Sequence, residues 1–189
     1  MNFIATKARV TTRGIPPDSF LTELVQWGRT APDDIFAPND NDHDIYVLLE
    51  PILGPWENLA HRRAALLEEM RVHAGFESSW NFNEGVDVTN KTSMRNVNGQ
   101  ETGIFQVSFD STFIADGAMQ PFAVANGIGS VGSFITEMKT NHTLALEYYA
   151  RLVRVNIRWA GPLVRHEIDE WLSRVAVSEF QTLLTENEG

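Results

Sequence analysis

The stretch "RVHAGFESSWNF", residues 71–82, closes a long helical pattern that begins near Trp56. Apolar residues along the pattern fall on one broad face. The charged residues expected off that face are Arg62, Arg63, Glu68 and Arg71. Glu77 is flanked by an aromatic residue and two serines, with Trp80 just beyond. Because burial disfavours a charged carboxyl group, this crowded position suits an acid that keeps its proton near neutral pH.

Length and composition indicate one globular domain. The chain has 189 residues, of which 43% are hydrophobic and 21% charged, and it contains no cysteine. Disulfides, thiolate zinc sites and cysteine nucleophiles are thereby excluded. The net charge of -10 would repel nucleic-acid phosphates and anionic membranes, so neither is an expected partner.

The N-terminal sequence lacks the apolar core of a signal peptide, and no apolar run approaches the length of a membrane span. We therefore expect a soluble protein, made in the cytoplasm without a signal peptide. If the protein is exported, a leaderless route is expected.

Periodicity predicts a mainly helical chain with one polar excursion. The predicted helices are 17–29, 56–77, 141–158 and a final segment from 162 that is split in two. The other segments are a loop at 33–44, a short apolar stretch broken by Pro51 and Pro55, a loop or small β-hairpin at 81–103, an apolar-alternating stretch at 104–113 and a glycine-rich connection at 127–134. We divide this single domain into an N-terminal helical extension (1–55), a catalytic core (56–161) and C-terminal helices (162–189).

The polar excursion brings further acids and aromatic residues near Glu77. A glycosidase needs a protonated acid beside the scissile oxygen and, in most cases, a second carboxylate. Candidates for the second carboxylate are Glu84, Asp87 and Glu101. Aromatic residues available to stack on sugar faces are Trp80, Phe82, Phe105 and Phe109.

Two motifs carry a resemblance to a known group of enzymes. "ESSWN" at 77–81 and "TGIFQVS" at 102–108 resemble the paired motifs of the soluble lytic transglycosylases and goose-type lysozymes. In that group a Glu-Ser pair at a helix end is followed by a Gly-x-x-Gln segment. This chain has Ile-Phe where Leu-Met is commoner, and its two motifs are spaced farther apart. A third motif, Ala-Tyr-Asn-Ala-Gly on a later helix, has only partial counterparts in "LEYYARL" (146–152) and "IRWAG" (157–161).

The resemblance implies a lysozyme-like α+β domain with a small β-hairpin lobe beside a substrate cleft. Glu77 would be the general acid that cleaves a β-1,4-linked aminosugar polymer, and no cofactor or metal is implied. The implied substrate contacts are Ser78, Trp80, Phe105, Gln106, Tyr149 and Trp159. Lytic transglycosylases close a sugar hydroxyl onto the anomeric carbon, whereas hydrolases use a second acid. We favour hydrolysis, with Glu101 as that acid and Asp87 as the other choice.

Peptidoglycan is the substrate that the resemblance favours, and chitin or chitosan is the alternative, since an acidic surface attracts cationic chitosan. A phage lysis enzyme, a secretion-system effector or a domain of a larger protein are the expected settings. Other readings stay open. Glu101 and Asp87 also fit solvated loop acids, Gln106 fits a half-buried strand, and Tyr149 and Trp159 fit a helical core.

A non-catalytic glycan- or protein-binding module, or an assembly protein that uses the 141–158 helix, would have the same helical pattern. "DNDHD" at 40–44 begins like a calcium loop but lacks the glycine and the final glutamate, so we expect a solvated loop. No HExxH motif is present, and the glycine-rich 127–133 segment lacks the lysine of a phosphate loop.

Overall fold

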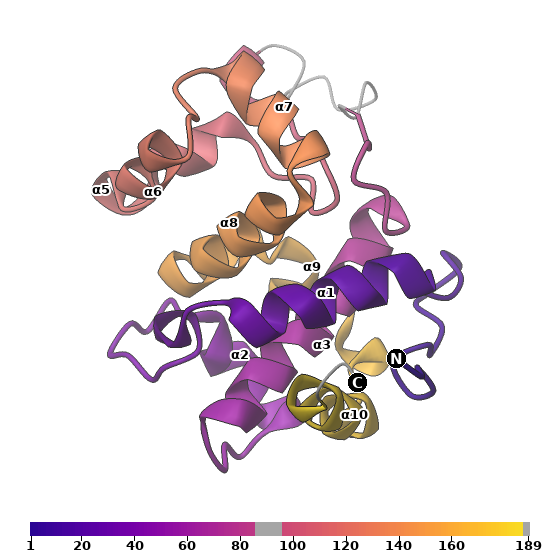
Figure 1. The fold of residues 1–189 in the computed structure, drawn as a ribbon. Coiled ribbons are helices and arrows are strands. Elements are labelled where there is room, and N and C mark those ends of the chain that lie inside the picture. Colours follow the sequence, from indigo (N-terminus) through magenta and orange to yellow (C-terminus); the bar gives the residue numbers. More distant parts are fainter. Residues whose placement is uncertain (86–95, 187–189) are drawn as a thin grey trace.

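Helix α3 (Leu59–Ser78) runs through the core of the fold (Figure 1). The computed structural model describes residues 1–85 and 96–186. Helices α1 (Asp18–Thr30) and α10 (Arg174–Thr185), from the two ends of the chain, both pack against α3. The described part also contains α2 (Ile45–Leu53), α5 (Ile114–Gly117), α6 (Gln120–Ala125), α7 (Val131–Thr140), α8 (His142–Val155) and α9 (Gly161–Val164).

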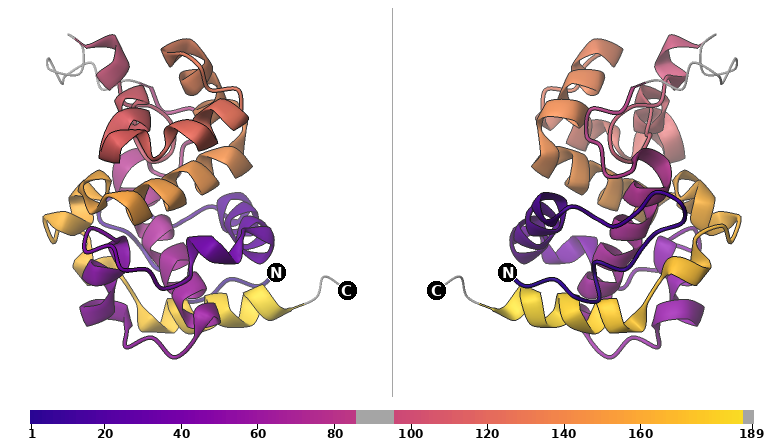
Figure 2. Two further views of the ribbon diagram at one scale, coloured as in Figure 1. Left: turned by 90° about the vertical axis from the view of Figure 1, so that its left-hand side faces the viewer. Right: turned by 90° about the vertical axis from the view of Figure 1, so that its right-hand side faces the viewer.

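Helix α8 lies between two groups of helices, with α5 to α7 on one side and α1, α2, α3 and α10 on the other (Figures 1 and 2). Its two adjacent tyrosines point to different groups. The Tyr148 hydroxyl is 2.5 Å from Ser111 Oγ, and its ring contacts Phe122 and Phe134. Tyr149 instead reaches α3. A single helix therefore links both groups through neighbouring side chains.

Helix α3 is buried on nearly every side, so the predicted amphipathic pattern is wrong. Arg62, Glu68 and Arg71, expected at the surface, are buried. Glu68 accepts two hydrogen bonds of 2.7 Å from Arg71, and the Arg62 guanidinium lies 3.6 Å above the ring centre of Tyr46. Buried charges are tolerated only when they are paired or hydrogen-bonded: Glu68 and Arg71 pair with each other, and Arg62 donates to the Phe36 carbonyl.

The predicted helices at 17–29, 56–77 and 141–158 are confirmed as α1, α3 and α8, and the split final segment is confirmed as α9 and α10. The apolar stretch at 45–56 was expected to be broken by Pro51, but α2 continues through this residue. Asp44 caps α2 by accepting the N–H of Tyr46, and one face of the helix is buried. The glycine-rich segment at 127–134 is only partly a connection. Ser130 caps α7 through a reciprocal capping box with Ser133, so the helix begins within this segment.

The expected β-hairpin lobe is not shown in residues 1–85 and 96–186. In this part of the chain β pairing is limited to two isolated bridges, Val10 with Gly14 and Thr102 with Val107. The stretch at 104–113 forms a turn followed by a 3-10 helix (Phe109–Phe113) instead of a strand. Residues 86–95, which the hairpin would include, lie outside the described residues.

Two polar residues of the loop at 33–44 bind the end of α8, which the polar composition of the loop does not predict. Asp44 is buried and accepts the Nε–H of Arg154 at 2.8 Å, while Asn41 donates to the carbonyls of Arg154 and Val155. The expectation of a solvated loop is therefore wrong for these two residues. Separately, none of the described helices combines the length and apolar composition needed to cross a bilayer.

Candidate active site

The C-terminal end of α3 presents Glu77 at the edge of the core. Helix α3 ends because Ser79 and Trp80 adopt left-handed conformations, with φ of 55° and 62°. Trp80 then folds back onto the helix and donates its Nε1–H to the Arg71 carbonyl at 2.9 Å. A side chain at Gly75 would collide with the indole, since its Cβ would lie 2.5 Å from Cζ2. Gly75 thus allows the indole of Trp80 to pack against the last turns of α3.

Ser78, the residue after the candidate acid, joins the first motif to the second. Its hydroxyl lies 3.0 Å from the carbonyl oxygen of Ala74 and 2.8 Å from that of Ile104, and it donates to one of them at a time. It also accepts the backbone N–H of Asn81 at 3.1 Å. Ser78 is buried, so in this structure it anchors the 102–107 segment beside Glu77.

The second motif forms a tight turn. The backbones of Thr102 and Val107 exchange hydrogen bonds of 2.9 and 3.2 Å. Gly103 has a φ of +73°, and a Cβ there would lie 3.0 Å from the Met138 carbonyl oxygen, so both the backbone conformation and the space favour glycine. Gln106 closes the turn by donating from Nε2 to the Gly103 carbonyl at 2.9 Å.

A buried polar cluster that the sequence analysis missed lies beneath Glu77. Nδ1 of His73 is 3.1 Å from Oε1 of Glu69 and 2.8 Å from the hydroxyl of Tyr149. Tyr149 donates to Oε1 of Glu69 at 2.8 Å, and its ring stacks on Phe105 at 4.0 Å between centroids. The signal was present, because Glu69, His73 and Glu77 are spaced four residues apart and so share one helix face.

Glu77 is the exposed end of this row of side chains. Its side chain is 26% exposed, and its Oε1 lies 3.8 Å from Nε2 of His73. The guanidinium of Arg165, which follows α9, interacts with it electrostatically. The pKa of Arg165 is raised, chiefly by its hydrogen bond to Glu167 and further by the carboxylate of Glu77. Gly161 leaves room for that guanidinium, since a Cβ there would lie 2.8 Å from Nη1.

The other expected site residues fall into three groups. Trp80, Phe105 and Tyr149 are buried and packed against other side chains, so their ring faces support the site from below and are closed to a sugar in this structure. Gln106, Trp159 and Glu101 are half-buried and can reach the surface. Asp87 lies outside the described residues.

Of the additional candidates, Phe82 is buried and stacks on His142, with 3.6 Å between the ring centres. Glu84 accepts a 3.0 Å hydrogen bond from the side chain of Asn81. Its carbonyl oxygen also accepts the N–H of Gly103 at 3.1 Å, which ties the 81–84 loop to the second motif. Within residues 1–85 and 96–186, no group of three or more His, Asp or Glu side chains could hold a metal ion.

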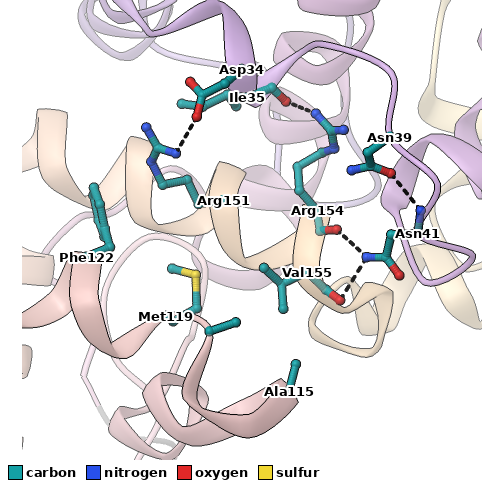
Figure 3. Close-up of a pocket in the computed structure, with 11 residues that line it drawn as sticks. Asp34, Ile35, Asn39, Asn41, Ala115, Met119, Phe122, Arg151, Arg154 and Val155 are labelled. Atoms are coloured by element: carbon teal, nitrogen blue, oxygen red, sulfur yellow. Dashed lines mark hydrogen bonds and ion pairs between the residues drawn. The ribbon is translucent and has the colours of Figure 1, made fainter.

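A separate cavity of about 500 Å³ opens between α5 and α6 on one side and the 34–41 region on the other (Figure 3). Arg151 and Arg154 of α8 line it, but both guanidinium groups are paired with carboxylates. Arg151 Nη1 lies 3.1 Å from Asp34, and Arg154 is held by Asp44. Glu77 is not among its lining residues.

The geometry thus gives a half-exposed carboxyl group on a rigid helix end, with a buried polar cluster behind it and a motif-bearing turn beside it. Known proteins add no assignment, because no family model, curated protein or solved structure matches the chain.

Proposed function

We propose that this protein is a glycosidase of lysozyme-like type that cleaves a β-1,4-linked aminosugar polymer, with Glu77 as the general acid. The observation that carries the proposal is the hydrogen bond of Ser78 to Ile104. It places the Glu-Ser pair directly against the Gly-x-x-Gln turn, 26 residues away in the chain. The resemblance in sequence pairs these same two motifs. Their contact in the fold is what an active site shared between them requires.

In the proposed reaction Glu77 donates its proton to the glycosidic oxygen while positive charge develops on the sugar ring. The partly buried position limits the water around the carboxyl group. Helix α3 fixes the backbone of Glu77 because it is packed on almost every side. The chain therefore supplies a rigidly held acid, and rigid placement accounts for a large part of enzymatic rate enhancement.

Peptidoglycan is the substrate that we favour over chitosan. The preference rests on the resemblance in sequence, because the net charge of -10 would attract cationic chitosan and the Arg165 guanidinium is already paired with Glu167 at 2.8 Å. Uncharged chitin remains a candidate, as does a glycan-binding module that has lost catalysis.

The second acid decides between hydrolysis and internal ring closure. Glu101 is half-buried near the start of the Gly-x-x-Gln turn, so we keep it as the first candidate, with Asp87 as the second. In inverting hydrolases the two carboxyl groups are about 6.5–9.5 Å apart, and in retaining ones about 5–5.5 Å. Substitution of Glu101 by glutamine should abolish hydrolysis if it activates water, and should leave cleavage intact if the sugar closes on itself.

The test is digestion of purified peptidoglycan, chitin and chitosan, with mass spectrometry of the soluble fragments. The proteins compared are the wild type, Glu77→Gln and a control, Glu50→Gln, which makes the same change at an exposed position on α2. Fragments from the wild type and the control, but not from Glu77→Gln, would support the proposal. Fragment masses distinguish hydrolysed from anhydro ends. Absence of fragments from all three proteins, or equal cleavage by all three, would overturn the role of Glu77.

A further inference from the structure

The side chain of His73 contacts both the buried cluster and the candidate acid. It is 1% exposed, and its two ring nitrogens face in different directions. Nδ1 faces Glu69 and Tyr149, whereas Nε2 faces Glu77. Phe105 packs against the same ring, at 6.2 Å between centroids. A buried imidazole held on three sides has little freedom to turn.

The position of the hydrogen on His73 follows from the tyrosine. Burial, followed by the carboxylate of Glu69, raises the pKa of Tyr149 well above its ordinary value, so the hydroxyl keeps its proton. That single proton is donated to Glu69. The tyrosine oxygen can then only accept from Nδ1, which must carry a hydrogen. In the neutral ring Nε2 is therefore the nitrogen without a hydrogen, and it is the one that faces Glu77.

The contact between Nε2 and Oε1 of Glu77, at 3.8 Å, is longer than a hydrogen bond. Catalytic hydrogen bonds are often long without substrate and tighten when it binds, and here a shift of about 1 Å is enough. A neutral His73 would accept the proton of Glu77, whereas an imidazolium would donate to its carboxylate. The pair thus holds one proton in either of two places.

We propose that His73 is a positioning residue for Glu77: Glu69 and Tyr149 fix its ring through Nδ1, and through Nε2 it orients the acid and exchanges one proton with it. The inference rests on the proposed function and adds to it the group that controls the acid. Oε2 of Glu69 is buried without a hydrogen-bond partner among the described residues, whereas its Oε1 faces both His73 and Tyr149. Besides Glu69 and Tyr149, the charged group that acts on Glu77 is Arg165, which is itself paired with Glu167.

In the reaction, Glu77 transfers its proton to the leaving oxygen and becomes a carboxylate. The shared proton has then left the pair and His73 is neutral, and the proton released by the attacking water or sugar hydroxyl restores the pair to its starting state. This role differs from structural support, because it predicts a change at a particular nitrogen and in the pH dependence of cleavage.

The first test needs no substrate. We would record ¹⁵N spectra of the histidine rings in wild type and in Glu77→Gln. The expected result is a hydrogen on Nδ1 of His73 in both proteins and a resonance of Nε2 that differs between them. His142, the first residue of α8, pairs with Glu23 of α1 and serves as the control. Its ring resonances should be the same in both proteins. A hydrogen on Nε2 alone, or identical Nε2 resonances in the two proteins, would overturn the inference.

The second test measures kcat, KM and the pH–rate profile of His73→Gln and Tyr149→Phe. Misplacing a reacting group by about 1 Å costs about 100-fold, so we expect His73→Gln to lower kcat by about that factor with KM little changed. Tyr149→Phe keeps the stack on Phe105 and so tests the anchor if the histidine variant fails to fold. It should lower kcat and alter the pH profile, and folded variants with wild-type kcat and profile would overturn the inference.

The two tests separate failure of the inference from failure of the proposed function. If the wild type cleaves no glycan, the proposed function fails, and the spectra alone still decide whether His73 responds to Glu77. If the wild type is active and Glu77→Gln is not, unchanged kinetics in both cluster variants remove the role of His73 alone.

Discussion

Replacing Gly75 by alanine should displace Trp80 from the end of α3. The added Cβ would lie 2.5 Å from Cζ2, 2.9 Å from Cε2 and 3.2 Å from Cη2 of the indole. Carbon atoms in favourable contact are about 3.5–4.0 Å apart, so the ring would have to retreat by about 1 Å. Its hydrogen bond to the Arg71 carbonyl would stretch with it.

The size of the effect follows from three opposing contributions. Overpacking of a buried site costs about 1–3 kcal/mol, and the weakened hydrogen bond costs about 1 kcal/mol. Alanine in place of glycine in a helix returns about 1 kcal/mol. The expected net loss for Gly75→Ala is therefore about 2 kcal/mol, which corresponds to a fall in Tm of about 4–8 °C for a chain of this size.

The assay is thermal and urea unfolding followed by circular dichroism. Gly132→Ala in α7 is the matched control, because a Cβ there meets nothing closer than Ser130 Oγ at 3.9 Å, and its Tm should rise. In a Trp80→Phe background the cost of Gly75→Ala should shrink, since phenylalanine lacks the clashing atoms. The reasoning is refuted if Gly75→Ala raises Tm as Gly132→Ala does, or if Trp80→Phe leaves the cost unchanged.

Three further predictions concern stability. Burial acts to raise the pKa of Glu179, but hydrogen bonds from the backbone N–H groups of Thr6 and Ile4 outweigh it and hold that pKa below its ordinary 4.5. Its contribution to stability is therefore present above pH 4.5 and lost as pH falls through the lower folded-state pKa, so Glu179→Gln should flatten the acid limb of the unfolding curve. Burial raises the pKa of all three tyrosines above 10.0, so their stabilising contribution is lost above pH 10, and tyrosinate absorbance should appear only as the protein unfolds. Glu68→Leu should cost about 3–5 kcal/mol in urea unfolding, because it leaves the fully buried Arg71 without its carboxylate.

Where the signals were local, the sequence predicted the fold well. Helix α1 follows Pro17 and ends before Pro32, and α8 is capped by Asn141, whose side chain accepts the N–H of Leu144. The sequence does not predict α2, because Pro51 is a strong signal against a helix. In the structure the apolar residues around it nevertheless form one buried helix face. The loss of one backbone hydrogen-bond donor destabilises the helix less than the burial of that apolar face stabilises it.

The polar core could not be predicted, because its partners are far apart in the chain. Tyr149 meets Glu69 across 80 residues, and Arg71 donates to the carbonyl of Trp171 across 100. Without these partners a charged residue in a helical pattern is rightly assigned to the surface. For the same reason the sequence predicts that Glu77 lies at a partly buried helix end, but it does not identify Glu69, His73 and Tyr149 as the cluster behind it.

The buried polar groups of α3 give the candidate acid its direction. A helix with only apolar side chains could rotate or slide within its pocket at small cost, because apolar contacts are not directional. On α3, however, Arg62 donates to the Phe36 carbonyl, Glu68 accepts the N–H of Ser173, and Ser78 donates to Ile104. Any rotation would leave several buried groups without partners, at about 1–3 kcal/mol for each. Buried polar contacts of this kind contribute little to net stability. On α3 they instead fix the rotation of the helix, which holds Glu77 at the surface with His73 directly behind it.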